Sequence, residues 1–267
     1  MDLQLKGRRA LVTGSSSGIG ECIARMLAEE GATVVVHGRD RERAERIAAE
    51  IGAAGVAIGD LSNDEGAAAV FAEAEGALGA SIEVLINNAG GNSSGNSSQP
   101  PLVIAAPDYL ANYNANTLSA VRLANHAVPA MVAAGWGRVI NVSCAVAVQP
   151  NNMGSDYSGA KAALNNFTVS LAGSLRGAGV TVNTITPGII MVDGMIRWGR
   201  TRYGDAALSI EEITRRMSED GIFDLPLAGR LGQPEEVAMV ACMLASPRLG
   251  YVTGSNYRVD GGQIRSV

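Results

Sequence analysis

The sequence predicts an α/β fold, a doubly wound parallel β-sheet with helices on both faces. Short apolar segments alternate along the chain with segments of helical periodicity, and strands separated by helices pair in parallel. The apolar segments do not alternate with polar residues, which is typical of strands buried on both faces. The 267 residues show no break in composition. We therefore expect a single domain over residues 1–267, because one α/β domain can reach this length.

Four strands and three helices are expected in the first half of the chain. Gly31 ends the first helix, Asp40 caps the second, and a helix opens near Ser62. Ser62 and Glu65 have the spacing of a capping box. The expected order is strand 10–13, helix 19–30, strand 33–36, helix 40–51, strand 56–58, a helix from residue 62, and strand 84–86.

The second half continues the same alternation. Pro234, followed by two glutamates, marks the start of its last helix. The expected order is a long helix from 108 to about 134, strand 138–142, a helix from 157 to about 176, strand 180–185, helix 234–245 and strand 256–259. Two segments interrupt the pattern, the polar segment 90–101 and the long segment 188–230. Because ligands bind beyond the carboxyl ends of strands in such sheets, we expect 188–230 to form a substrate-binding lid within the domain.

Charge and cysteine usage exclude several classes of function. The net charge of −5 argues against nucleic acid or an anionic membrane as the main partner. The sequence shows neither an apolar stretch of about 18 residues nor a signal peptide. Cys22, Cys144 and Cys242 lie too far apart for a disulfide framework or a zinc site. We therefore expect a cytoplasmic protein without a metal site.

A glycine-rich turn follows the first strand and leads into a helix. Gly14, Gly18 and Gly20 allow backbone to approach a pyrophosphate, and the helix N-terminus directs N–H groups and positive dipole toward it. Such a turn alone can also be purely structural, but the strand before it and the helix after it favour a dinucleotide site. The residues expected to contact the cofactor here are Gly14, Ser16, Ser17, Gly18, Ile19 and Gly20.

The end of the second strand indicates which dinucleotide binds. A carboxylate there would bind the ribose 2′-hydroxyl of NAD. Gly38 offers none, whereas Arg39 could pair with a 2′-phosphate, unless it is an ordinary solvated arginine. We interpret Asp40 as the N-cap of the next helix. The sequence therefore favours NADP(H) over NAD(H).

Several motifs occur in an order that resembles a known family. The chain contains T-G-x-x-x-G-x-G at 13–20, N-N-A-G at 87–90, Y-x-x-x-K at 157–161 and P-G at 187–188, and further motifs extend to G-G at 261–262. This ordered set resembles the short-chain dehydrogenase/reductase family, and in particular its members related to 3-oxoacyl carrier-protein reductases. The resemblance covers residues 5–263 and implies a Rossmann fold, an oxidoreductase activity and a homotetramer.

The Y-x-x-x-K pair has the spacing that proton transfer requires. Reduction of a ketone needs a hydride on carbon and a proton on oxygen, and the usual pKa of tyrosine, near 10, is too high for free exchange at neutral pH. Lys161 lies one helical turn from Tyr157, where its charge would lower that pKa. The resemblance implies that Tyr157 is the general acid, that Lys161 also binds the nicotinamide ribose, and that Asn116 holds a water that relays protons to the lysine.

The resemblance also implies cofactor contacts further along the chain. In the pair Asp60–Leu61, Asp60 matches a residue that contacts the adenine ring. Three residues at the end of the fourth strand match the segment beside the adenosine ribose. The pair P-G ends the sixth strand, and the isoleucine that follows it would lie near the carboxamide. These residues are Asn87, Ala89, Gly90, Pro187, Gly188 and Ile189.

Two positions depart from the family pattern. The family's catalytic serine usually lies thirteen residues before the tyrosine, where this chain has Cys144, and a thiol is a weak hydrogen-bond donor. Either Cys144 performs the role poorly, or a bulge presents Ser143, or another group such as Ser155 helps. We do not expect a reactive thiolate, because no histidine or basic residue flanks Cys144 in the sequence. The second departure is Val192, where the family often has a threonine that binds the carboxamide.

The predicted lid combines apolar and basic residues. Its apolar members would form an adaptable cover for the substrate; they are Met191, Met195, Ile196, Trp198 and Tyr203. Arg197, Arg200 and Arg202 could bind an anionic substrate, although solvated helix charges are the commoner role of such residues. We interpret His37 and His126 as structural.

Together these features predict an NADP(H)-dependent enzyme that interconverts a small-molecule carbonyl and a secondary alcohol. Cys144 supports an alternative, a nucleotide-binding regulatory or scaffold protein that has lost efficient turnover. A lyase or isomerase that uses the same tyrosine has no specific support in the sequence.

Overall fold

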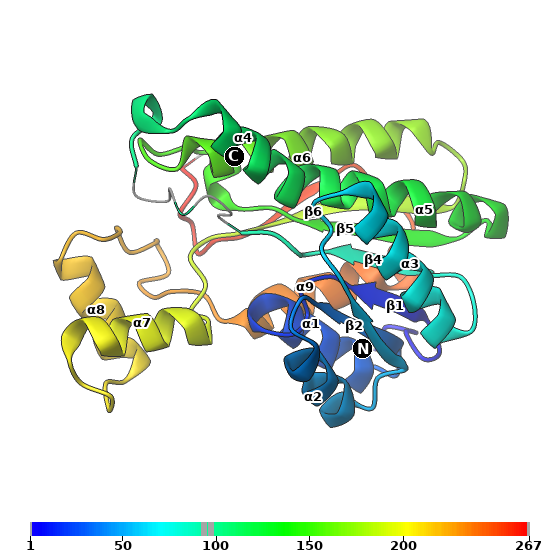
Figure 1. The fold of residues 1–267 in the computed structure, drawn as a ribbon, viewed down its shortest axis with the longest axis horizontal. Coiled ribbons are helices and arrows are strands. Elements are labelled where there is room, and N and C mark those ends of the chain that lie inside the picture. Colours follow the sequence, from blue (N-terminus) through cyan, green and yellow to red (C-terminus); the bar gives the residue numbers. More distant parts are fainter. Residues whose placement is uncertain (1, 92–94, 96–98, 266–267) are drawn as a thin grey trace.

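Seven short segments form one parallel β-sheet in the computed structural model, which describes residues 2–91, 95 and 99–265 (Figure 1). The sheet has the order β3-β2-β1-β4-β5-β6-β7. The central strands are buried along their whole length, as the uninterrupted apolar segments predict. The strands are β1 (Arg9–Val12), β2 (Thr33–Gly38), β3 (Gly55–Ile58), β4 (Val84–Asn87), β5 (Gly137–Val142), β6 (Val180–Pro187) and β7 (Asn256–Val259). The doubly wound fold is therefore confirmed.

Two layers of helices cover the sheet, one on each face (Figure 1). One layer consists of α1 (Gly18–Glu29), α2 (Arg41–Ile51) and α9 (Pro234–Ala245). The other consists of α3 (Asp64–Leu78), α5 (Ser119–Ala134) and α6 (Ser155–Ser174). A separate apolar core lies on each face, and both consist mainly of alanine, valine, leucine and isoleucine. The small side chains explain how so few aromatic residues suffice.

The strand order reverses between β1 and β4, so the loops after these two strands diverge and leave a crevice. The two loops are held together by Asn88, whose Nδ2 donates to the carbonyl oxygens of Thr13 at 2.9 Å and Gly14 at 3.3 Å. A Cβ atom on Gly20 would lie 2.4 Å from both Asn88 Nδ2 and the Gly14 oxygen. Gly20 is therefore required for the close approach of α1 to the β4 loop.

The long helix expected from residue 108 to about 134 is interrupted. The chain forms α4 (Ala106–Tyr113), then a π-helical turn at Asn114–Leu118, and then α5. A π-turn inserts an extra residue and occurs frequently at functional sites. Hydrophobic periodicity did not reveal it, because the apolar faces before and after the turn are each regular.

The predicted capping box at Ser62 and Glu65 is wrong. The N-cap of α3 is Asn63, whose side chain accepts the Gly66 N–H at 2.8 Å. Ser62 instead donates from its hydroxyl to the Asp60 carboxylate at 2.7 Å. The prediction for Asp40 is confirmed, since it caps α2 by accepting the Arg43 N–H at 3.1 Å.

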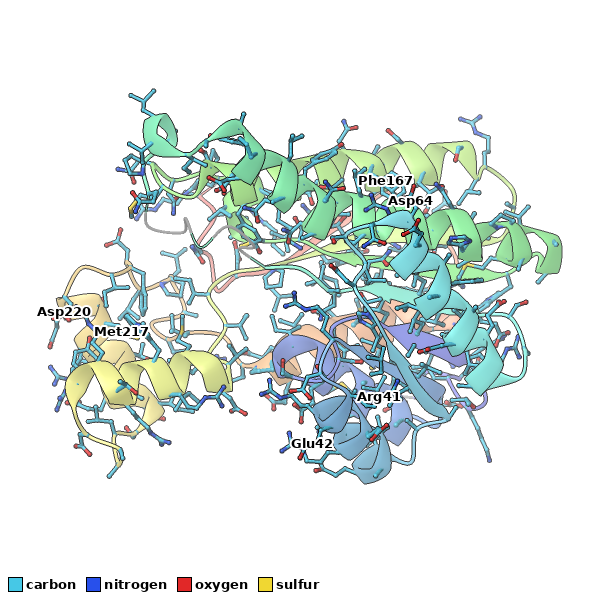
Figure 2. All side chains as sticks on the ribbon, viewed as in Figure 1. Arg41, Glu42, Asp64, Phe167, Met217 and Asp220 are labelled. Atoms are coloured by element: carbon cyan, nitrogen blue, oxygen red, sulfur yellow. The ribbon has the colours of Figure 1, made fainter. Side chains whose placement is uncertain are left out.

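The segment between β6 and α9 forms α7 (Asp193–Tyr203) and α8 (Ile210–Glu219), which project to one side of the sheet (Figure 1). The apolar residues predicted to cover a substrate mostly pack inside this segment instead. Met191 joins Ile213 and Met217 in its small core, and Met217 and Asp220 mark the end of α8 in Figure 2. The partly buried residues around this core include Met195, Ile196 and Tyr203.

Two of the three arginines predicted to face a substrate, Arg200 and Arg202, have structural partners. Arg200 donates to the Leu208 carbonyl oxygen at 3.2 Å, and Arg202 pairs with Asp220 at 3.2 Å while lying over the ring of the half-exposed Trp198. The two arginines therefore hold α7 to the segment that follows it.

His37 ties the ends of the first three strands together. Its Nδ1 accepts the Gly14 N–H at 2.9 Å, and its Nε2 lies 3.3 Å from the Gly59 carbonyl oxygen. Both contacts are made at once by a neutral ring with its proton on Nε2. Burial lowers the pKa of His37 to about 4. His37 therefore has the structural role that the sequence indicated, and it holds the glycine turn in place.

This burial predicts a specific pH dependence of stability. In the unfolded chain His37 becomes protonated as the pH falls below about 6.5. In the folded chain it stays neutral until the pH reaches about 4. The free energy of unfolding should therefore fall by roughly 3 kcal/mol through His37 as the pH drops across this window. Urea unfolding of wild type and His37→Asn between pH 7 and 4.5 isolates the effect, because the variant keeps an acceptor for Gly14 but does not titrate. Parallel stability curves for the two proteins would contradict the assignment.

Candidate active site

A cavity of about 520 Å³ opens at the carboxyl ends of β1 to β4. It combines most of the residues that the sequence predicted for a cofactor, namely Gly14, Ser16, Ser17, Gly18, Ile19, Gly20, Arg39, Asp60, Leu61, Ala89 and Gly90. Gly38 and Val192, which the sequence marked as departures from expected contacts, also line the cavity. The sequence interpretation missed the other lining residues, namely His37, Gly59, Ser62, Asn88, Gly91 and Ala115. Several of these residues are small, and several lie next to a predicted residue in the sequence. Either property could have identified them.

The glycine turn and the end of β2 fit closely together. A Cβ atom on Gly38 would lie 2.6 Å from Ser16 Oγ, so the missing side chain at residue 38 makes room for this serine. Ser17 is the extended N-cap of α1, and Gly18 follows with a φ of 61°. The cavity is thus closed at one end by a helix N-terminus, where N–H groups lack partners within the helix.

The charged groups on and beside the cavity wall differ in whether they already form hydrogen bonds or ion pairs within the protein. Two hydrogen bonds from Ser62 hold the pKa of Asp60 below its usual value. The Asp40 carboxylate is used in capping α2. Arg39 is exposed and lines the cavity, and within the part of the chain that the structure describes it forms no ion pair. Arg39 is therefore a cation on the cavity wall at the end of β2.

Some predicted cofactor residues lie away from this cavity. Asn87 is buried, and its Nδ2 donates to Asn141 Oδ1 at 2.8 Å inside the sheet. Pro187, Gly188 and Ile189 follow one another at the end of β6, where the Ile189 N–H donates to Gln263 Oε1 at 3.2 Å. Val192 reaches the cavity wall and lies 3.6 Å from the position of a Cβ on Gly18.

Lys161 is buried beneath this edge of the sheet. Its Nζ donates to the Val142 carbonyl oxygen at 2.9 Å and lies 5.9 Å from the centre of the Tyr157 ring. Burial lowers the pKa of Lys161 to about 8. A Cβ on Gly90 would lie 3.3 Å from Lys161 Nζ. Gly90 therefore leaves the lysine room to reach this edge.

Tyr157 and Cys144 are neighbours in the structure. Cys144 follows β5 with an extended backbone and a half-buried side chain. Burial, together with a smaller contribution from the neighbouring Cys144, raises the pKa of Tyr157 well above its usual value. The expectation that Lys161 lowers this pKa is therefore not met in the structure, where the Lys161 ammonium is directed to Val142 instead.

The fold also gives Cys144 a basic neighbour that the sequence did not show. Lys161 is close enough for its charge to interact with Cys144, and this interaction favours the protonated lysine. Ser143 points elsewhere, because its Oγ donates to the Lys161 carbonyl oxygen at 3.4 Å and is buried. Ser155 lies 2.6 Å from the Tyr109 hydroxyl. Neither serine takes the place of Cys144 beside Tyr157.

Asn116 lies in the π-turn, and its side chain forms hydrogen bonds to the loop after β4. Its Oδ1 accepts the Gly91 N–H at 2.9 Å, and its Nδ2 donates to the Gly91 carbonyl oxygen at 2.9 Å. A Cβ on Gly90 would lie 2.4 Å from Asn116 Oδ1 and would displace it. Gly90 is thus in contact with both Asn116 and Lys161, so the loop after β4 brings the two side chains to one place.

A second cavity of about 520 Å³ adjoins the end of β6. Val146, two residues after Cys144, lines it together with Ile189. Its walls also carry polar and charged side chains from three separate segments, namely Gln149, Asn151, Asp224, Gln263 and Arg265. Apolar residues between α8 and α9, among them Ile222, Phe223 and Leu225, complete it. The lining is therefore more polar than the apolar cover that the sequence suggested.

Two features are absent among the described residues. No helix among them is long and apolar enough to cross a membrane. Within the same residues, no three His, Cys, Asp or Glu side chains are grouped so that they could hold a metal ion.

The family model for short chain dehydrogenases matches residues 8–202. A 3-oxoacyl-[acyl-carrier-protein] reductase (FabG) from Pseudomonas aeruginosa is 35% identical over 270 residues, which cover 99% of this chain and 100% of the relative. L-Sorbose reductase from Gluconobacter frateurii, solved with NADPH and L-sorbose, has a TM-score of 0.89 at 31% identity and full coverage of both chains. A gluconate 5-dehydrogenase from Burkholderia cenocepacia, in complex with NADP and tartrate, has a TM-score of 0.82 at 28% identity, covering 100% of this chain and 98% of the other.

The match to the family model spans most of the chain, and residues of the glycine turn and of the N-N-A-G motif line one cavity. The chain therefore belongs to the short-chain dehydrogenase family of oxidoreductases.

Proposed function

We propose that this protein is an NADP(H)-dependent oxidoreductase that interconverts a carbonyl group and a secondary alcohol. The observation that carries the proposal is the meeting of Tyr157, Lys161 and Cys144 next to Gly90, which lines the first cavity. A regulatory protein that has lost efficient turnover is the second candidate, and it is favoured by the thiol at residue 144.

The first cavity fits a dinucleotide. A helix N-terminus closes one end, and the glycines at 14, 18 and 20 keep side chains out of the turn, so phosphate oxygens can approach backbone N–H groups. Arg39 offers a cation at the end of β2, where a 2′-phosphate would lie. The bound cofactor would supply or accept the hydride. Ile189 would lie near its carboxamide, and Lys161 would bind the nicotinamide ribose.

Tyr157 serves as the general acid in reduction. The hydroxyl is protonated at neutral pH, which is the form that donates a proton to a carbonyl oxygen, and its raised pKa makes it a weaker acid than an ordinary tyrosine. Cys144 lies where it can orient that oxygen, but as a thiol it polarises the carbonyl less than a hydroxyl would. Lys161 replaces the proton on Tyr157, and Asn116 connects the lysine to solvent.

The second cavity supports a small, polar substrate. Amide side chains at 149, 151 and 263 can bind hydroxyl groups, and Arg265 can bind a carboxylate. L-Sorbose reductase, which is structurally similar, was solved with a polyhydroxylated ketone. Because 3-oxoacyl carrier-protein reductases are among the relatives of this chain, acyl thioesters are the alternative class of substrate. We further propose, from the family resemblance, a homotetramer in the cytoplasm, with segment 188–230 as the substrate lid.

The role of Cys144 predicts a gain of activity. Cys144→Ser supplies a stronger donor to the carbonyl oxygen, so kcat for reduction should rise about tenfold, or roughly 1.4 kcal/mol. NADPH oxidation with a panel of ketoses, keto acids and 3-oxoacyl esters measures it. The matched control is Cys22→Ser, a half-buried thiol on α1, which should stay within about twofold of wild type. An unchanged or lower rate for Cys144→Ser would refute the assignment, and wild type that binds NADPH but reduces no carbonyl would favour the regulatory alternative.

The cofactor assignment predicts a selective loss of affinity. Arg39→Ala removes the partner of the 2′-phosphate, so the Kd for NADPH should rise about ten- to a hundredfold while the Kd for NADH changes little. Arg41→Ala is the control, since Arg41 lies exposed on neighbouring α2 (Figure 2). It pairs there with Glu45 at 3.2 Å. Fluorescence titration gives both constants. Tighter binding of NADH than NADPH by wild type, unaffected by Arg39→Ala, would show that the preference is wrong.

A further inference from the structure

A buried polar pair joins the helix before the π-turn to the helix that carries Tyr157. Asn112 on α4 and Asp156 on α6 are 0% and 1% exposed. Asn112 Nδ2 donates to Asp156 Oδ2 at 2.7 Å. An interior amide–carboxylate bond of this length is a charge-assisted contact, which is stronger and more directional than a neutral hydrogen bond.

Each member of this pair lies next to a residue of the candidate active site. Asp156 immediately precedes Tyr157, so its side chain turns toward α4 while Tyr157 and Lys161 share a different face of α6. Asn112 lies one turn before Asn116 and accepts the Asn116 Nδ2 on its carbonyl oxygen at 3.0 Å. Its side-chain Oδ1 lies 3.4 Å from the same nitrogen. The pair therefore connects Asn116 on one side with the turn of Tyr157 on the other.

The connection reaches Lys161 through the loop after β4. Asn116 holds the backbone of Gly91 by two hydrogen bonds of 2.9 Å each, and Gly90 lies against Lys161 Nζ. The π-turn lacks the regular hydrogen bonds of an α-helix, so side-chain contacts must fix the direction of Asn116. Asn112 is the residue that supplies such contacts from the preceding turn.

Stability alone does not account for a carboxylate at this position. Taking a charge out of water is costly, and a pair of apolar side chains of similar size often fills such a space with equal or better stability. What an apolar pair cannot supply is direction, because it would let α4 slide or rotate against α6. The polar pair fixes the distance and orientation between the two helices.

We propose that the Asn112–Asp156 hydrogen bond is a positioning contact that sets Asn116 relative to Lys161 and Tyr157, so that proton supply to the lysine depends on it. This proposal rests on the proposed function for its kinetic consequences. Its structural consequence, the hold of Asn116 on Gly91, is independent of turnover.

A swap of the two side chains tests the pair. Asn112→Asp alone places two buried carboxylates against each other, and kcat should fall about ten- to a hundredfold, with a shifted pH profile of kcat and the KM for NADPH within about twofold. Adding Asp156→Asn restores one donor and one acceptor, so the double variant N112D/D156N should recover kcat to within about threefold of wild type. The control is Tyr109→Phe, which removes the exposed contact to Ser155 between the same two helices and should leave kcat and its pH profile unchanged.

Amide hydrogen exchange provides the readout that needs no turnover. The Gly91 N–H is protected by Asn116 Oδ1, so its exchange measured by NMR should speed up about tenfold in N112D and return toward wild type in the double variant. Any one of three results would overturn the proposal. Folded N112D could keep the kcat and pH profile of wild type, the folded double variant could fail to recover kcat, or the exchange rate of the Gly91 N–H could stay unchanged. If wild type reduces no carbonyl, the proposed function fails, and Gly91 exchange still decides the role of the pair.

Discussion

The burial of the Lys161 ammonium group is the constraint on which the rest of the site depends. Lowering its pKa from the usual value to about 8 corresponds to a cost of roughly 3 kcal/mol for keeping this charge inside the protein. The Val142 carbonyl oxygen offsets part of that cost by accepting a hydrogen bond at 2.9 Å. Gly90 keeps a side chain out of the lysine's path and lets Asn116 close over the loop. The strand ends, the π-turn and α6 are therefore all packed around the Lys161 ammonium group.

The thiol at residue 144 changes the electrostatics of this arrangement. Cys144 interacts with both Tyr157 and Lys161, and it raises the pKa of each relative to burial alone. The protonated lysine can replace a proton that the tyrosine gives up, but the raised pKa makes the tyrosine a weaker acid. The weak donor strength of a thiol acts in the same direction, because it leaves the carbonyl oxygen less polarised. Both effects of residue 144 therefore favour slow reduction.

The sequence predicted the sheet, both helical layers and most of the first cavity, because each depends on local patterns such as apolar strands and glycines at fixed spacing. It did not predict contacts between segments far apart in the chain. His37 holds the glycine turn across 23 residues, and Lys161 approaches Cys144 only after α6 packs on β5. The π-turn around Asn116 and the cap at Asn63 were missed because alternative local patterns, a continuous helix and a capping box at Ser62, matched equally well. The polar lining of the second cavity comes from three separate segments and leaves no local signature.

The most direct test of the account follows the hydride and the proton together. NADPH with both C4 hydrogens replaced by deuterium is incubated with a reducible ketone, and the product is examined by mass spectrometry and NMR for wild type and Tyr157→Phe. The account predicts that wild type places the label on the carbinol carbon. It also predicts that Tyr157→Phe still binds NADPH but transfers the label at least about a hundredfold more slowly, because the proton donor is gone. Absence of label in the wild-type product, or equal transfer by the two proteins, would contradict it.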